Sequence, residues 1–334
     1  MLAIVQNPFD GLFSRLQRYG RPILEYRFLI PLLNHWLGLR GFQAVLPGVV
    51  ASFFNLFLLS RIIRARTRDI SYTLFLCVGF SFSFFIAEGT TFLCSPDSVS
   101  HFFVLCLVAF DLPFAAACLL TLCAMLVDER AIFSLAFSWI FKFRDSELSL
   151  QASSKTSSNS WLGLGLSIFV GLLLWKGIRV GLDFGWWAAP IQSSLLQDQS
   201  SQVFASATPL VGWPAWFINT IAAFKWIYFF PGVYTYRLFQ GLVRRDSGFP
   251  HLPTSGVVFS WCLNLLLFSI VIAASAFNGD VWRTVSFAYL FLIEACVSLH
   301  ALRPTQARRM ASASAVLMIA TPVAYVASDL SERI

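Results

Sequence analysis

Charged residues are scarce in this chain. Only 12% of its 334 residues are Asp, Glu, Lys or Arg, whereas about a quarter of a soluble domain is charged. Hydrophobic residues make up 57% of the chain, and its mean hydropathy is +0.70. A surface so poor in charge would not stay dissolved in water. The composition therefore excludes an ordinary soluble domain and favours lipid as the surrounding medium.

Several motifs of known chemistry are also missing. The chain has no GxxxxGK[ST] phosphate loop, no GxSxG nucleophile elbow and no GxGxxG sequence after a strand. Its histidines are scattered without HExxH spacing, and its cysteines form no CxxC pair, so we expect neither a metal site nor a cofactor. The net charge is +7, but the basic residues lie in short loops rather than in a stripe with aromatics. We therefore expect no nucleic-acid partner.

Long apolar runs are what the chain does contain. They predict an all-α polytopic transmembrane bundle of about ten or eleven membrane helices, since a full crossing needs about 20 apolar residues. The runs between Val99 and Phe141 are shorter, which predicts tilted or re-entrant helices, or alternatively two long helices. The predicted crossings are Phe42–Ser60, Ser71–Glu88, Val99–Phe110, Pro113–Val127, Ala131–Phe141, Trp161–Gly181, Pro214–Tyr236, Ser255–Phe277, Thr284–Ala301 and Ala311–Ala327.

The positions of the basic residues support this alternation of crossings. Loops that face the cytoplasm are enriched in Lys and Arg. On this topology the opposite side receives in its loops only Arg130, Arg283 and Arg333. The predicted cytoplasmic side receives Arg61, Arg64, Arg66, Arg68, Lys142, Arg144, Lys155, Arg237, Arg244, Arg245, Arg303, Arg308 and Arg309.

The predicted boundaries divide the chain into three parts. Residues 1–41 form an N-terminal segment, residues 42–327 the transmembrane bundle, and residues 328–334 a C-terminal tail. Within the first part, Ile23–Leu39 is apolar at helical spacing but includes charged and amide residues. It is either a tilted first crossing or an amphipathic helix on the outer surface.

Two polar segments interrupt the apolar runs. Ser146–Ser160 is rich in serine and predicts a flexible cytoplasmic loop. Leu182–Trp213 has no Lys or Arg and contains several tryptophans, which predicts an outer segment. That segment is a surface helix at the lipid headgroups or a loop that faces a substrate.

Charges near a membrane are energetically expensive, so each is a candidate for function. On the predicted topology one set lies at the outer helix ends, where carboxylates beside arginines suit proton transfer and phosphate binding. The competing interpretation is that the aspartates of this set cap helices. Deeper in the runs, Lys225 and Glu294 either pair with each other or line a polar cavity. The outer set is Asp97, Asp128, Glu129, Arg130, Asp280 and Arg283.

Four short stretches resemble bacterial membrane glycosyltransferases of the GT-C type, which use polyprenyl-phosphate sugars. They are Glu25–Leu33, with an Arg-x-x-x-Pro-Leu-Leu run; Ser95–Ser98, which opens a short helix; Asp128–Ala131, between short helices; and Asp280–Arg283, an Asp-x-x-Arg start to a late helix. The resemblance implies an outward-facing cavity, a polyprenyl-phosphate-linked sugar as donor, and the bacterial inner membrane as location.

The resemblance also implies roles for individual residues. Asp128, Glu129, Asp10 and Asp97 would be the candidate catalytic acids, with Asp128 or Asp10 as base, and Arg130, Asp280, Arg283 and Arg27 would bind substrate. Two other classes remain open. One is a transporter or lipid-handling protein, and the other is a non-catalytic membrane partner in an envelope complex. Charges that converge at one outer site favour the enzyme, and a polar path past Lys225 and Glu294 favours transport.

Overall fold

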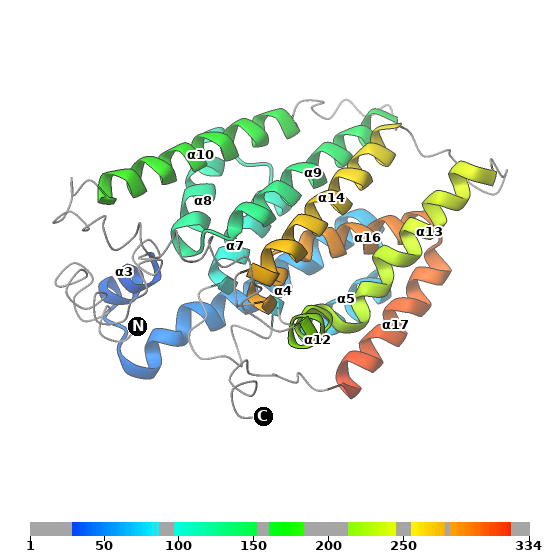
Figure 1. The fold of residues 1–334 in the computed structure, drawn as a ribbon, viewed down its shortest axis with the longest axis horizontal. Coiled ribbons are helices and arrows are strands. Elements are labelled where there is room, and N and C mark those ends of the chain that lie inside the picture. Colours follow the sequence, from blue (N-terminus) through cyan, green and yellow to red (C-terminus); the bar gives the residue numbers. More distant parts are fainter. Residues whose placement is uncertain are drawn as a thin grey trace.

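The fold consists entirely of helices in the part of the chain that can be described. The computed structural model describes residues 29–83, 85–86, 97–151, 160–183, 213–244, 255–277 and 281–321. Every regular element there is an α-helix or a short 3₁₀ turn, which confirms the all-α prediction (Figure 1). Asp10, Arg27, Asp280 and most of the outer segment 182–213 lie outside the described residues.

Among the described residues, three helices are long and apolar enough to cross a membrane, which indicates an integral membrane protein. They are α4 (Leu46–Thr67, extended at its start by the 3₁₀ turn Gly41–Val45), α10 (Ser160–Asp183) and α14 (Ser255–Phe277). Only 17% of the apolar stretch of α10 and 28% of that of α14 is buried. The remaining apolar side chains face outward, where lipid is the medium that accommodates them.

The other helices are shorter, and several match the short runs of the sequence. The helices α7 (Asp97–Ala109) and α8 (Phe114–Val127) form a hairpin, and α9 (Ala131–Gln151) follows after a tight turn. The alternative of two long helices is therefore wrong. The remaining helices are α3 (Leu29–Trp36), α5 (Ile70–Ser81), α12 (Trp213–Phe224), α13 (Phe229–Arg244), α15 (Val281–Ser286), α16 (Tyr289–Leu302) and α17 (Pro304–Ala320).

Two predicted crossings are broken. Pro214–Tyr236 divides into α12 and α13 at a 3₁₀ turn, Lys225–Tyr228, because Lys225 takes a left-handed backbone conformation with φ +45°, which does not continue a helix. Figure 1 shows α12 almost end-on while α13 and α14 run in the plane of the view. Thr284–Ala301 divides into α15 and α16 at a turn closed by the hydrogen bond from Ala288 N–H to the Val285 carbonyl.

The helix α9 corrects another prediction. It continues ten residues beyond Phe141 to Gln151, so the first part of the predicted loop Ser146–Ser160 is helical. Because α9 continues, Arg144 lies on a helix that packs against α14 and α16 rather than in a loop. Residues 152–159 lie outside the described part.

The core lies around α16, whose residues from Tyr289 to Cys296 are all buried against α4, α9, α13 and α17. A second close approach joins α10 to α8. A β-carbon added at Gly171 would lie 2.6 Å from the β-carbon of Thr121, so only glycine allows the two backbones to pack this closely.

Ion pairs gather near both ends of α9. Arg130 immediately precedes the helix, whereas Arg66 pairs with Asp145, and Lys142 with Asp111, in its second half, toward the opposite end of the bundle. We call that second end of the bundle the basic end. Arg130 and Arg144 are fourteen positions apart, which corresponds to about 21 Å along an α-helix. Which of these two ends faces the cytoplasm stays a prediction from the sequence.

Candidate functional site

Four charged side chains from three separate parts of the chain meet at one point, which we call the outer cluster: Asp97, Asp128, Arg130 and Arg283. Asp97 is the first residue of α7, and Asp128 follows the last residue of α8. Arg130 stands immediately before α9, and Arg283 is on α15. Up to 186 sequence positions separate these residues, so tertiary packing brings them together.

The turn between α8 and α9 is built by Asp128 itself. Its backbone is extended, with φ −155°, which ends α8. Its Oδ1 accepts a hydrogen bond from the Arg130 N–H at 2.9 Å, and its carbonyl accepts one from the Ala131 N–H. Asp128 therefore caps the start of α9, as the competing interpretation predicted, and pairs with arginine as well.

The arginines bridge the two carboxylates. Arg130 places Nε 2.9 Å from Oδ1 and Nη2 2.6 Å from Oδ2 of Asp128, and its Nη2 is 3.2 Å from Asp97 Oδ2. Arg283 places Nε 2.7 Å from Oδ2 and Nη2 2.6 Å from Oδ1 of Asp97, with Nη2 3.5 Å from Asp128 Oδ2. Each arginine thus holds one carboxylate in a fork and reaches the other.

Burial makes these contacts strong. Asp97 and Asp128 are completely buried, and the Arg130 side chain is only 6% exposed. The Arg283 side chain is 25% exposed, so it is the member of the cluster that faces the surroundings most. Two positive and two negative charges cancel, which lets the group stay out of water.

Neighbouring residues hold the start of α7 in place. Asn55 on α4 donates to the Ser98 carbonyl at 2.8 Å, and Ser98 Oγ donates to the Gly48 carbonyl at 3.0 Å. Arg130 also lies 5.5 Å from the centre of the Phe287 ring, within range of a cation–π contact. The cluster is therefore anchored on α4, α9 and the turn between α15 and α16.

The geometry limits what the aspartates can do. Every carboxylate oxygen of Asp97 and Asp128 already accepts a hydrogen bond from an arginine, so neither is well placed to remove a proton. Glu129 lies in the same turn with a partly exposed side chain. Of the predicted site residues, the structure brings together Asp97, Asp128, Arg130 and Arg283, and Glu129 stands between two of them in the α8–α9 turn. Asp280, Asp10 and Arg27 are outside the described residues.

A second buried network rules out one of the two alternatives for Glu294, its pairing with Lys225. Glu294 lies 3.1 Å from Arg144 and accepts a hydrogen bond from Asn264 at 2.7 Å. Arg144 also reaches the Tyr234 hydroxyl at 3.4 Å. Sequence reasoning missed this group because Arg144 was assigned to a loop, although the polar Asn264 and Glu294 inside apolar runs were a signal.

A third group lies at the basic end, in the connection between α4 and α5. Asp69 caps α5 by accepting from the Tyr72 N–H at 3.0 Å, lies 3.0 Å from His300 Nε2, and pairs with Arg308. Burial alone would raise the pKa of Asp69, but the hydrogen bonds from Tyr72, Arg308 and His300 lower it to about 2. Asp69 is thus a structural anion that ties α5 to α16 and α17.

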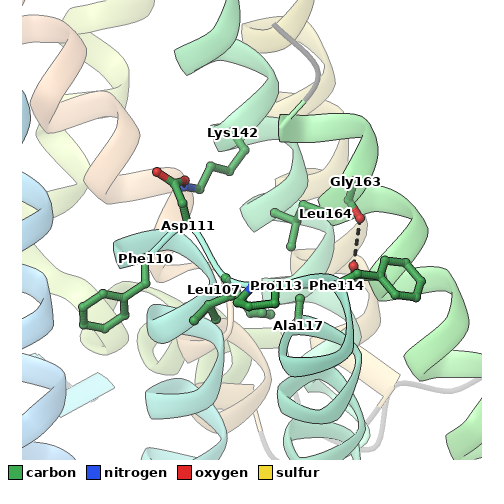
Figure 2. A pocket seen from close by; sticks show the side chains of 11 residues that line it. Leu107, Phe110, Asp111, Pro113, Phe114, Ala117, Lys142, Gly163 and Leu164 are labelled. Atoms are coloured by element: carbon green, nitrogen blue, oxygen red, sulfur yellow. Dashed lines mark hydrogen bonds and ion pairs between the residues drawn. The ribbon is translucent and has the colours of Figure 1, made fainter. Parts of the chain in front are cut away.

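A cavity of about 420 Å³ also lies at the basic end, between the α7–α8 turn and α10. Figure 2 shows Lys142 and Asp111 directed toward each other in this pocket, and their ion pair measures 3.0 Å. The Asp111 side chain is 91% exposed. The one lysine in the pocket wall is therefore already neutralised by an open, hydrated carboxylate.

Comparisons of the chain with protein-family models, with curated proteins and with solved structures give no match. Arguments about function therefore depend on the geometry of the described residues.

Proposed function

We propose that this protein is a membrane glycosyltransferase-like enzyme that binds the phosphate of a lipid-linked sugar at the outer cluster. The observation that carries the proposal is the meeting of two arginines and two aspartates at one end of the bundle. Guanidinium groups are favoured ligands of phosphate oxygens, and the two aspartates hold both arginines in fixed positions. The short GT-C-like stretches of the sequence point to the same chemistry.

The residues divide into two roles in this proposal. Arg283 and Arg130 hold the phosphate of the donor, and Arg283 is the first to meet it because it is the more exposed. Asp97 and Asp128 position the arginines and prevent two buried cations from repelling each other. We assign the base to Glu129 in the same turn, or to Asp10 as the resemblance implies.

The reaction is then a substitution at the sugar. An acceptor hydroxyl oxygen forms a bond to the anomeric carbon, and the bond from that carbon to the phosphate oxygen breaks. The lipid phosphate leaves with the electron pair and is stabilised by the arginines, while the hydroxyl proton passes to the carboxylate base.

One observation favours a different function, that of a non-catalytic membrane partner. The carboxylate oxygens are all occupied by arginine, so the cluster also serves as a clamp between α7, α9 and α15. The transport hypothesis has less support, because Glu294 is paired with Arg144 while Lys225 donates to the Thr321 carbonyl.

Substitution of Arg283 distinguishes the enzymatic function of the outer cluster from a purely structural one. Arg283→Lys keeps the charge but loses the fork, and we expect sugar transfer from a polyprenyl-phosphate donor in membrane vesicles to fall by about 100-fold. The folded fraction, measured by thermal unfolding in detergent, should change little. Loss of stability in proportion to loss of transfer would favour the clamp instead.

Arg66→Lys is the matched control. Arg66 makes the same type of forked pair, with Asp145, but at the basic end and with a similarly exposed side chain. It should leave transfer unchanged. Full transfer by Arg283→Lys in a correctly inserted protein would refute the proposed phosphate site.

A further inference from the structure

A second cavity lies apart from the outer cluster, on the surface formed by α12, α13 and α14. It is an open groove of about 640 Å³, a size typical of small-molecule sites, and its walls are almost entirely apolar. Several wall residues face outward, among them Phe217, Ile221 and Phe229, whose exposed fractions are 58%, 45% and 57%. The groove therefore opens toward the medium that surrounds the bundle, which is lipid.

The groove walls are held in place by contacts of their own. Trp216 donates from its indole N–H to Ser275 at 3.0 Å, and the Tyr228 hydroxyl donates to the Thr220 carbonyl at 2.9 Å. Trp226 and Phe229 stack with ring centres 5.8 Å apart. A groove with fixed aromatic walls is preorganised for an apolar chain.

Lys225 is the only Lys, Arg, Asp or Glu among the described residues that line the groove.

 Among the described residues it has no carboxylate within ion-pair distance, and its Nζ donates to the Thr321 carbonyl at 2.6 Å. An ammonium group has three donors, so this contact leaves two of them for a ligand. In the pocket at the basic end, by contrast, Lys142 is neutralised by Asp111.

The backbone at Lys225 is unusual as well. Its φ of +45° is a left-handed conformation that a residue with a β-carbon adopts only under strain. The other described non-glycine residue with positive φ, Arg68, ends α4, where this conformation is common. Lys225 likewise follows the last residue of its helix, α12, and there the chain changes direction toward α13 beside the groove.

The groove is at the same end of the bundle as the outer cluster. Both α12 and α14 pack against α15, which carries Arg283, and the groove residues Phe268 and Ile272 are in the second half of α14. On the predicted topology this half of the bundle lies in the outer leaflet, so a lipid in the groove would belong to that leaflet.

We propose that this groove binds one anionic phospholipid of the surrounding membrane, with an acyl chain along the aromatic walls and the phosphate at Lys225. The charge of Lys225 selects an anionic headgroup, and the apolar walls select a chain rather than a free anion. The proposal does not depend on the function assigned to the outer cluster, because neither the groove nor its test involves a sugar donor.

The test measures which lipids stay bound to the purified protein. The full chain is exchanged into phosphatidylcholine vesicles with and without phosphatidylglycerol, extracted in mild detergent and examined by native mass spectrometry. We expect the wild type to retain one phosphatidylglycerol. Lys225→Gln should reduce this retention by about fivefold, the effect of one basic residue on an anionic lipid, and Lys225→Arg should restore it.

Two further variants complete the design. Lys142→Gln, the matched control in the pocket at the basic end, should retain phosphatidylglycerol as the wild type does. Ile272→Phe adds bulk to the groove wall without changing its charge, and it should also lose the lipid. Equal retention of both lipids by the wild type, or normal retention of phosphatidylglycerol by Lys225→Gln, would overturn the proposal. Retention by Ile272→Phe would show that Lys225 attracts only the phosphate, and would overturn the acyl-chain groove.

Discussion

Replacing Arg130 with Met is the most direct test of the outer cluster as a buried ion network. Methionine keeps an unbranched side chain but removes the charge and three side-chain hydrogen bonds, two to Asp128 and one to Asp97. Hydrogen bonds to charged groups contribute about 1.5–3 kcal/mol each, but their effects do not add fully within one network.

The remaining arginine sets the size of the effect. Arg283 still holds Asp97 in a fork, but it reaches Asp128 only at 3.5 Å. Asp128 is therefore left buried with little compensation, and breaking a buried pair in this way typically destabilises a protein by about 3–5 kcal/mol. We expect a loss of that size for Arg130→Met, and a smaller loss for Arg130→Lys.

The assay is reversible unfolding in mixed micelles as the fraction of denaturing detergent is raised. Arg130→Met is compared with Asp128→Asn and with the double variant, which should be less destabilised than the sum of the two single variants. Lys142→Gln, whose partner Asp111 is exposed, should change stability by less than about 1 kcal/mol. A loss below about 1 kcal/mol for Arg130→Met would mean that water solvates the cluster, and it would refute this reasoning.

Three other predictions follow from the structure. Gly171→Ala should destabilise the protein by about 1–3 kcal/mol in thermal unfolding, because its new β-carbon meets α8, whereas Gly163→Ala, with open space around it, should not. Glu294→Gln should destabilise by about 3–5 kcal/mol, because it leaves Arg144 buried without a counter-charge; an unchanged melting temperature would contradict this. The pKa of Asp69 is lowered to about 2, so its contribution to stability is complete above its usual pKa of 3.8 and disappears as the pH falls toward 2. Asp69→Asn should therefore remove part of the loss of stability seen in that pH range, and identical pH profiles would contradict this assignment.

The sequence predicts the helices and the end of the bundle at which charges gather. The run Ser255–Phe277 coincides with α14, because uninterrupted apolar residues between polar flanks leave one span for the helix. Asp97, Asp128 and Arg283 could be assigned to the same end because an even number of predicted crossings precedes each of them. Their contacts could not be predicted, because contact depends on how each helix is rotated and on where α15 ends.

The errors of the sequence analysis have a common physical origin. Apolar runs show where lipid or core surrounds the chain, but they do not show where the backbone changes direction. Lys225 ends α12 inside such a run by adopting positive φ. In the opposite case, α9 continues through polar residues because Arg144 finds Glu294 and Tyr234 as buried partners. Of the two alternatives for Glu294, pairing with Lys225 is therefore wrong, because its partner is Arg144.

The distance between Arg130 and Arg144 along α9 has a consequence for the bilayer around the protein. A separation of about 21 Å is less than the hydrocarbon thickness of about 30 Å. Because both arginines are buried and paired with carboxylates, they can lie within that thickness without contact with the headgroups. We therefore expect lipids next to α9 to keep the ordinary bilayer thickness, since α9 continues to Gln151.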